Sequence, residues 1–150
     1  MQSYPALQIF ILTKPDGGQS IDFANPNAVK ALNAALLADY YKIQNWDIPK
    51  GYLCPPVPGR ADYVHYLADL LAEDNSAVVP IGKSIRGLDI GTGANVIYPI
   101  IANRSYGWKM VGTDIDPIST KSASTIIDLN PVLTGNIDIR LQQNQQHIFT

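Results

Sequence analysis

An apolar, strand-like run that ends in an acid and passes directly into a two-glycine turn limits the possible folds of this chain more than any other stretch. The run covers residues 85–90 with Asp89 near its end, and Gly91 and Gly93 form the turn. Glycine permits the sharp change of direction between strand and helix, and it lets a ligand approach the backbone because no Cβ is in the way. Such a turn at the carboxyl end of a parallel strand builds a nucleotide-type site in α/β proteins.

Strand and helix patterns alternate from residue 85 onward. Strand patterns cover residues 85–90 and 108–113 and the alternating Ile137, Ile139 and Leu141, and helix patterns cover residues 96–102 and the segment opened by Asp116 and Pro117. The order strand, helix, strand, helix, strand predicts a right-handed parallel α/β unit. We predict a Rossmann-like fold that is incomplete, because a doubly wound sheet has more than these first three parallel strands.

The residues before this unit predict an N-terminal helical cap. Residues 1–24 look irregular, Asn25 and Pro26 are suited to open a helix, and a proline-rich connection follows at residues 46–59. A second helix is expected at residues 60–74. Helical spacing predicts the buried faces of the two helices, with Val29, Leu32, Leu36 and Tyr40 on the first and Tyr63, Tyr66 or Leu67, Leu70 and Leu71 on the second.

The predicted domain organisation follows from this change of pattern. Residues 1–84 form the cap and the proline-rich connection, and residues 85–150 form the first half of the Rossmann-like domain, which stops before a fourth strand. A sheet edge left open where that strand should pair would invite self-association.

Composition limits the class of partner and the compartment. The formal net charge is −2, so a nucleic-acid partner would have to use a local basic patch. The single cysteine, Cys54, fits a reducing compartment, and with only two distant histidines, His65 and His147, no metal site is expected. We find no targeting segment and no window of about 20 apolar residues. We therefore expect a cytoplasmic protein with no membrane partner.

Two acids follow neighbouring strands of the predicted sheet. Asp89 ends the first strand, and Asp114 ends the second at the spacing from which an acid accepts hydrogen bonds from both ribose hydroxyls. A dinucleotide fits less well, since its fingerprint needs a third glycine where this chain has Val96. A carboxylate beside the turn favours a cationic nucleoside over a diphosphate. S-adenosylmethionine (SAM) is such a ligand; the alternatives are another nucleotide and a purely structural turn.

The residues around this turn resemble those of a known family. Residues 89–99 read Asp-Ile-Gly-Thr-Gly-Ala-Asn-Val-Ile-Tyr-Pro, and upstream segments at residues 21–32, 46–49 and 53–65 match as well. The pattern is similar to that of the large-subunit (23S) ribosomal-RNA adenine-N6 methyltransferases and their eukaryotic relatives of the methyltransferase-like protein 16 type. The resemblance runs from about residue 15 to the end.

The resemblance implies a SAM-dependent methyltransferase with a Rossmann-like fold that modifies the N6 amine of an adenine in 23S rRNA. The cofactor loop would be lined by Gly91, Gly93 and Asn95. Asp114 would hold the ribose, and the planar guanidinium of Arg60 would meet the carboxylate of SAM. Asp89 would face the methionine ammonium, directly or through water.

One motif of that family does not occur in this chain. Adenine-N6 methyltransferases of this type resemble one another in an Asn-Pro-Pro-Phe motif after the fourth strand, which accepts the hydrogens of the amine and stacks on the flipped base. Neither Asn25-Pro26 nor Asn130-Pro131 continues in this way. We therefore expect the cofactor-binding half of the enzyme, with no catalytic residues and no methyl transfer by itself. The alternatives are a non-catalytic SAM-binding or structural fragment and an oxidoreductase domain that uses NAD.

Overall fold

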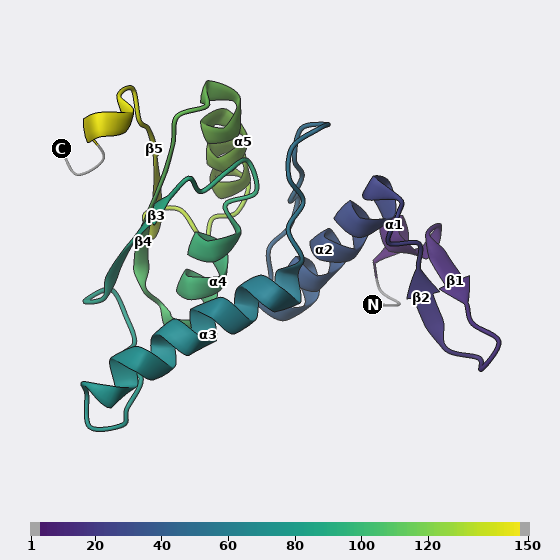
Figure 1. Cartoon of the computed structure of the whole chain (residues 1–150), viewed down its shortest axis with the longest axis horizontal. Helices are drawn as coiled ribbons and strands as arrows, with labels where there is room; N and C mark the ends of the chain where they lie inside the picture. Colours follow the sequence, from purple (N-terminus) through teal and green to yellow (C-terminus); the bar gives the residue numbers. More distant parts are fainter. Residues whose placement is uncertain (1–3, 148–150) are drawn as a thin grey trace.

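The computed structural model describes residues 4–147. Its main elements, in chain order, are α2 (Pro26–Tyr41), α3 (Val57–Glu73), β3 (Arg86–Ile90), α4 (Ile97–Tyr106), β4 (Lys109–Asp114), α5 (Pro117–Asp128) and β5 (Ile137–Leu141). Shorter elements lie towards the two ends, namely α1 (Pro5–Gln8), β1 (Ile11–Thr13), β2 (Gln19–Ile21) and the 3-10 helix η1 (Gln145–His147). The molecule is elongated, with the parallel sheet at one end and the β1–β2 hairpin at the other (Figure 1).

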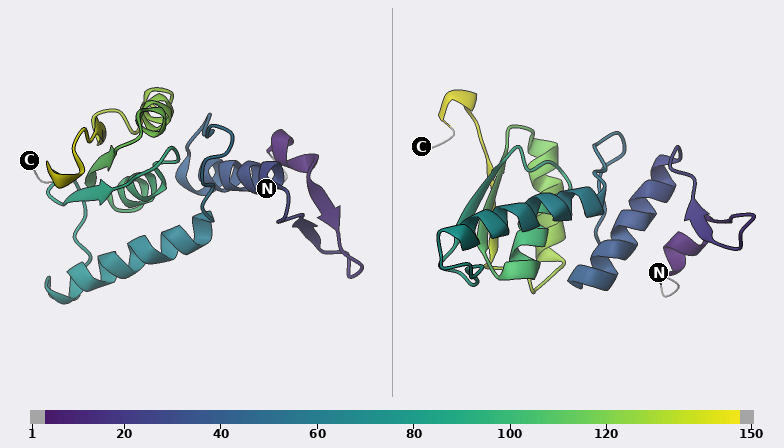
Figure 2. Two further views of the ribbon diagram at one scale, coloured as in Figure 1. Left: turned by 45° about the horizontal axis from the view of Figure 1, so that its top comes forward. Right: turned by 60° about the horizontal axis from the view of Figure 1, so that its bottom comes forward.

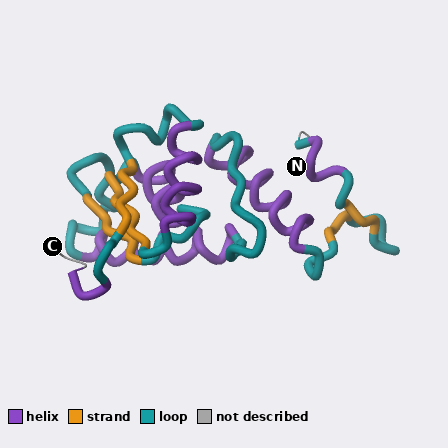
Figure 3. Tube along the Cα trace, turned by 90° about the horizontal axis from the view of Figure 1, so that it is seen from above, coloured by secondary structure: helices purple, strands orange, loops and turns teal. Residues whose placement is uncertain are grey.

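The sheet contains β3, β4 and β5 in that order, and neighbouring strands are parallel. The connections α4 and α5 both return over the same side of the sheet (Figure 3), as right-handed crossovers in one direction require. The long helix α3 packs on α4 and extends beyond it alongside the sheet (Figure 2). The structure therefore confirms the α/β, Rossmann-like fold with its first three parallel strands.

The helix starts follow the predicted signals of a capping side chain and a proline. Asn25 accepts a hydrogen bond from an N–H group in the first turn of α2 at 3.0 Å, and Asp116 accepts two in the first turn of α5 at 3.1 and 3.3 Å. Pro26 and Pro117 are the first residues of these helices. Pro99 lies in the first turn of α4, where its missing N–H group costs no helical hydrogen bond.

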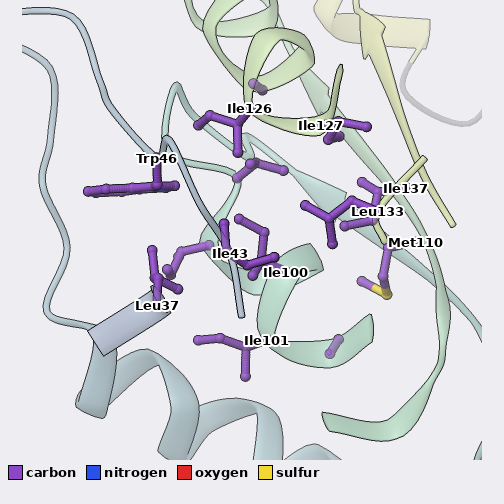
Figure 4. Close-up of a cluster of buried hydrophobic side chains, with 14 of the residues drawn as sticks. Leu37, Ile43, Trp46, Ile100, Ile101, Met110, Ile126, Ile127, Leu133 and Ile137 are labelled. Atoms are coloured by element: carbon purple, nitrogen blue, oxygen red, sulfur yellow. The ribbon is translucent and has the colours of Figure 1, made fainter. Parts of the chain in front are cut away.

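One hydrophobic core joins the cap to the sheet. Leu37 on α2 and Ile43 and Trp46 in the segment after it pack with Ile100 and Ile101 on α4 (Figure 4). Each of these five side chains is at most 4% exposed. The predicted cap and the predicted α/β unit thus contribute to the same core. The boundary between them at residue 84 stays a prediction.

A reciprocal pair of hydrogen bonds ties the segment after α2 to the loop after α5. The Gln44 N–H donates to Asn130 Oδ1 at 2.7 Å, and Asn130 Nδ2 donates to the Gln44 carbonyl at 2.8 Å. Asn130 is buried and also donates to the Ile126 carbonyl. Because one amide side chain satisfies both backbone groups of Gln44, it fixes this segment on the α/β unit much as a neighbouring strand would.

The N-terminal region is more ordered than predicted. Helix α1 and the antiparallel β1–β2 hairpin occupy part of the region that looks irregular in the sequence. Elements of three or four residues give too few repeats for a periodic signal. Leu7 and Ile21 from these elements pack against Ala28 and Ala35 of α2.

Contact on two sides changes the buried face of α2. The residues buried on this helix are Ala28, Asn33, Ala34, Ala35 and Leu37. The predicted face was wrong in part: Tyr40 is 71% exposed, whereas Val29, Leu32 and Leu36 are partly buried and pack against the two cores. Small alanines dominate the true face because they let the elements on both sides approach the helix backbone closely.

The apolar face predicted for the second helix is also wrong, and this difference matters for the surface. On α3 the buried residues are Val57, Val64 and Ala68, whereas Tyr63, Tyr66, Leu67, Leu70 and Leu71 are between 37% and 68% exposed. Four of them, all except Tyr66, line a groove of about 440 Å³ beside β3, called here the edge groove. In the described residues β3 pairs with a strand on one side only. The described chain contains no helix long and apolar enough to cross a bilayer.

Candidate functional site

The loop between β3 and α4 (residues 91–95, called here the glycine loop) is shaped by hydrogen bonds to β4. The N–H groups of Gly91 and Thr92 both donate to the Thr113 carbonyl, at 2.8 and 2.9 Å. Gly91 and Gly93 have φ values of +75° and +69°, a region that residues with a Cβ rarely adopt. A Cβ on Gly91 would meet no protein atom within 4 Å, so the space beside it is open to a ligand.

A cavity of about 220 Å³ lies against this loop. Its walls come from the glycine loop, from the segment before α3, and from the first turns of α3, α4 and α5. This glycine-loop cavity brings together four predicted site residues, Arg60, Gly91, Gly93 and Asn95, with Tyr52 and Tyr98. Segments that are far apart in the sequence therefore meet at the glycine loop.

Arg60 reaches the cavity because the start of α3 is anchored to α2. Asn33 on α2 is 2% exposed, and its Nδ2 donates to the Pro55 carbonyl at 2.7 Å and to Cys54 Sγ at 3.1 Å. This anchor fixes the point where α3 begins and hence the place of Arg60 in its first turn. Burial raises the pKa of the Cys54 thiol, which keeps it protonated and suits a structural role.

Asn95 holds the glycine loop against the cap. Its Oδ1 accepts from the Ile97 N–H at 3.1 Å, which helps to start α4. Its backbone carbonyl accepts from Trp46 Nε1 at 2.9 Å, and its Nδ2 donates to the Leu53 carbonyl at 3.4 Å. Asn95 is only 6% exposed, so most of its polar atoms serve the protein itself.

Asp114 lies at the end of β4 and braces the glycine loop. Its Oδ2 accepts from the Gly93 N–H at 2.9 Å, and its Oδ1 accepts from the Asp116 N–H at 3.0 Å. Each carboxylate oxygen has two lone pairs, so both oxygens can still accept from a pair of hydroxyl groups. Asp114 is not among the residues that line the glycine-loop cavity, and it contacts that cavity through Gly93.

Asp89 lines the edge groove and not the glycine-loop cavity, and Tyr98 lines both. In the described part of the chain, the Oδ2 atom of Asp89 is buried without a hydrogen-bond partner. Burial raises the pKa of this carboxyl, the nearby Thr92 side chain opposes the shift, and the charge of Asp114 raises it further. The carboxylates of Asp89 and Asp114, at the tips of adjacent strands, therefore influence each other electrostatically.

Three of the five backbone N–H groups of the glycine loop are already used within the protein. A phosphate-binding loop directs its N–H groups at the ligand. Here the N–H groups of residues 91–93 donate instead to the Thr113 carbonyl and the Asp114 carboxylate. With two carboxylates close by, a diphosphate finds neither these donors nor a favourable field, whereas a cationic nucleoside finds both acceptors and negative charge.

The Asp89→Asn substitution is expected to stabilise the unliganded protein at neutral pH. Because the pKa of Asp89 is raised, the folded state binds a proton here more tightly than the unfolded chain does. Its contribution to stability is therefore full below the unfolded pKa of about 3.9 and is lost as the pH rises through the folded value. We expect the variant to raise the free energy of unfolding at pH 7 by about 1 kcal/mol.

Urea unfolding at several pH values checks this expectation. The gain should shrink towards pH 4, where the wild-type carboxyl becomes protonated as well. Asp138→Asn, which changes an exposed acid on β5, is the matched control and should have little effect. A gain that stays constant with pH would show that the effect does not come from the charge of Asp89.

The whole chain, residues 1–150, matches a family model described as RNA methyltransferase. The chain belongs to this RNA methyltransferase family. The match confirms the family that residues 89–99 and the upstream segments resemble.

Curated members of the family are close in sequence. Ribosomal RNA large subunit methyltransferase F of Photobacterium profundum is 55% identical over 148 residues, which cover 99% of this chain and 44% of the relative. The protein of the same name from Pseudoalteromonas atlantica is 57% identical over 148 residues, with 99% and 45% covered. The chain thus spans less than half the length of these curated relatives.

Solved structures of METTL16 are similar to this chain in fold. The N-terminal domain of human METTL16 in complex with SAH (S-adenosylhomocysteine) matches 94% of the chain and 52% of its own, with a TM-score of 0.81 at 30% identity. The METTL16 catalytic domain in complex with a MAT2A 3′UTR hairpin matches 96% and 48%, with a TM-score of 0.82 at 29% identity. The methyltransferase family and the neighbour solved with SAH imply S-adenosyl-L-methionine as the cofactor.

The residues that line the glycine-loop cavity without having been predicted as site residues include Tyr52, Tyr98 and Ser119. Tyr98 stands inside the motif at residues 89–99, and the capping signal at Asp116 could have placed Ser119 in the first turn of α5. Tyr52 has no such signal. Its hydroxyl donates to Asp116 Oδ2 at 2.7 Å across 64 residues of sequence, which lowers the pKa of Asp116 and closes the loop before α3 over the cavity.

Proposed function

We propose that this chain binds SAM in the glycine-loop cavity, as the cofactor-binding part of an RNA methyltransferase. The observation that carries the proposal is that the N–H groups of residues 91–93 donate to the Thr113 carbonyl and the Asp114 carboxylate, with the Asp89 carboxylate close by. That arrangement suits a ribose and a positive charge and does not suit a diphosphate. SAM supplies an electrophilic methyl group when bound.

Different residues of the chain bind different parts of this cofactor. Asp114 accepts hydrogen bonds from the ribose hydroxyls, and the two positive-φ glycines allow close approach to the loop. Arg60 meets the carboxylate of the amino-acid part, for which a planar guanidinium is suited. Asp89 provides negative charge that favours the sulfonium and ammonium groups. Asn95 keeps the loop in the required shape.

The proposed substrate is an adenine in 23S rRNA, methylated on its N6 amine. Support for an RNA substrate comes from the names of the relatives, ribosomal RNA large subunit methyltransferase F, and from the METTL16 catalytic domain solved with an RNA hairpin. The N6 position rests on the motif at residues 89–99 and the family that it resembles. With an rRNA substrate, the proposed location of the protein is the cytoplasm.

We propose further that these 150 residues bind the cofactor but do not transfer the methyl group by themselves. Their sequence holds no Asn-Pro-Pro-Phe to accept the hydrogens of the amine and stack on the base. A methylation assay with the chain alone and 23S rRNA tests this point. Transfer of the methyl group from SAM to rRNA by residues 1–150 would overturn it.

Isothermal titration calorimetry with SAM, SAH and NAD tests the cofactor. We expect SAM and SAH to bind and NAD not to bind. Binding of NAD alone would favour an oxidoreductase domain and overturn the proposal. Binding of none of the three would leave a structural fragment.

The open edge of β3 and the apolar face of α3 carry a second proposal, that this chain self-associates. Leu67, Leu70 and Leu71 lie exposed along the edge groove, and Leu88 on β3 is 45% exposed. Unpaired strand edges beside apolar surface promote association.

Sedimentation velocity at increasing protein concentration checks this. We expect association that the Leu70→Lys substitution weakens without lowering thermal stability, because Leu70 is 58% exposed. Leu12→Lys is the matched control, since Leu12 is 53% exposed but lies on the β1–β2 hairpin at the other end of the molecule. A wild-type chain that remains monomeric at high concentration would contradict the proposal.

A further inference from the structure

Tyr98 lies between the glycine-loop cavity and the edge groove. It is the second residue of α4, and it lines both the glycine-loop cavity and the edge groove. Its hydroxyl accepts a hydrogen bond from Arg60 Nη1 at 3.2 Å. The Arg60 Cζ lies 5.6 Å from the centre of the Tyr98 ring, close enough for a cation–π attraction as well.

Arg60 has no acidic partner to hold it. Among residues 4–147 it forms no ion pair with a carboxylate, while the ion pair that the structure contains joins Lys30 to Asp47 at 2.9 Å. Tyr98 is therefore the side chain that orients the guanidinium, and it does so without neutralising its charge. A guanidinium held in this way keeps its remaining N–H groups and its full charge for an anionic ligand.

Tyr98 is itself held in place by α3. The rings of Tyr63 and Tyr98 meet edge to face, with centres 5.3 Å apart and an interplanar angle of 60°. Tyr63 follows Arg60 by three residues on α3, so both project from the same face of that helix. Tyr98 on α4 thus sits between them, and the three side chains form one cluster that bridges the two helices.

We propose that Tyr98 is the positioning residue that sets Arg60 for the carboxylate of the cofactor's amino-acid part. The inference rests on the proposed function and adds a residue to it. A long arginine side chain loses rotamer freedom when it binds a ligand, and prior orientation by Tyr98 removes much of that loss. The Tyr98→Phe substitution keeps the ring and its contact with Tyr63 and deletes only the hydroxyl that Arg60 contacts.

The test compares two ligands that differ in the part Arg60 should recognise. SAH carries the amino-acid carboxylate, whereas 5′-methylthioadenosine keeps the nucleoside and the sulfur and lacks that carboxylate. We expect Tyr98→Phe to raise the Kd for SAH about threefold to tenfold and to leave the Kd for 5′-methylthioadenosine unchanged. Arg60→Ala should raise the Kd for SAH by more, and the double variant should match Arg60→Ala, since Tyr98 acts through Arg60.

Tyr66→Phe, which deletes a hydroxyl from a 68% exposed tyrosine on α3, is the matched control and should bind both ligands as the wild type does. Thermal unfolding of each variant verifies that it folds. Equal weakening of both ligands by Tyr98→Phe, no weakening of either, or simple additivity in the double variant would overturn the inference. Failure of the wild-type chain to bind SAH would overturn the proposed function instead, so the two failures are distinguishable.

Discussion

Replacing Trp46 by alanine is expected to lower the free energy of unfolding by about 3–5 kcal/mol, a large part of the roughly 5–15 kcal/mol that stabilises a typical domain. The indole is 4% exposed and packs in the core with Leu37, Ile43 and Ile100 (Figure 4). Its removal leaves a cavity between the cap and α4, and it leaves the Asn95 carbonyl without the 2.9 Å hydrogen bond from Nε1. Urea unfolding followed by circular dichroism measures the loss.

Trp46→Phe separates the two contributions. The phenyl ring retains much of the buried volume and lacks the N–H donor, so a loss of about 1–2 kcal/mol is expected for this variant. Leu53→Ala is the surface control, since Leu53 is 69% exposed in the same part of the chain. Equal stability of the alanine and phenylalanine variants would contradict the role of packing at this position.

The second large effect is expected at Asp114, where replacement by alanine should weaken SAH binding by about 1–3 kcal/mol, or roughly 5- to 150-fold in Kd. The carboxylate is the acceptor proposed for the ribose hydroxyls, and it also braces Gly93 through the hydrogen bond at 2.9 Å. Both losses act in the same direction on affinity. Calorimetric titration with SAH measures the change.

An analogue of SAH without the ribose 2′-hydroxyl isolates the first of these roles. The wild type should prefer SAH over this analogue, and Asp114→Ala should bind the two with similar affinity. Asp138→Ala, an exposed acid on the neighbouring strand β5, is the control and should keep the wild-type preference. Unchanged affinity of Asp114→Ala for SAH would show that this carboxylate does not hold the ribose.

Local signals in the sequence predicted most of the α/β unit. The capping residue and the proline at the start of α2 and α5 predicted the helix starts correctly, because each capping signal depends on a hydrogen bond within one turn. The alternation of Ile137 and Ile139 with polar residues predicted β5 correctly because successive side chains of a strand point to opposite faces, and only one face is buried here. Helix faces were less predictable, since the face that α2 buries depends on α1 and the hairpin packing on its far side.

The faces of α3 illustrate a second limit. Leu67, Leu70 and Leu71 form an apolar stripe that any periodicity argument places inward, yet they lie exposed along the edge groove. Periodicity identifies a surface that favours contact but does not say whether the chain provides the contact. The small residues Val64 and Ala68 are buried instead, where α3 and α4 approach each other.

The candidate site was predictable where one motif contains it and less so where tertiary structure assembles it. Gly91, Gly93 and Asn95 follow from the turn, and Asp114 follows from its spacing. No signal in the sequence separates Asp89 from these residues, although Asp89 lines the edge groove. Strand alternation alone does not predict this placement, because the two cavities are formed by the tertiary structure, in which Tyr98 of α4 lines both.

The link between Gln44 and Asn130 has a consequence for the order of folding. The three parallel strands are joined by short crossovers and can pair early, whereas this link closes 86 residues of sequence. Closing so long a segment costs more chain entropy than pairing consecutive strand–helix units. The segment after Gln44, which forms one wall of the glycine-loop cavity, is therefore expected to dock late. A collapsed folding intermediate would then already contain the sheet but would not yet retain a nucleoside.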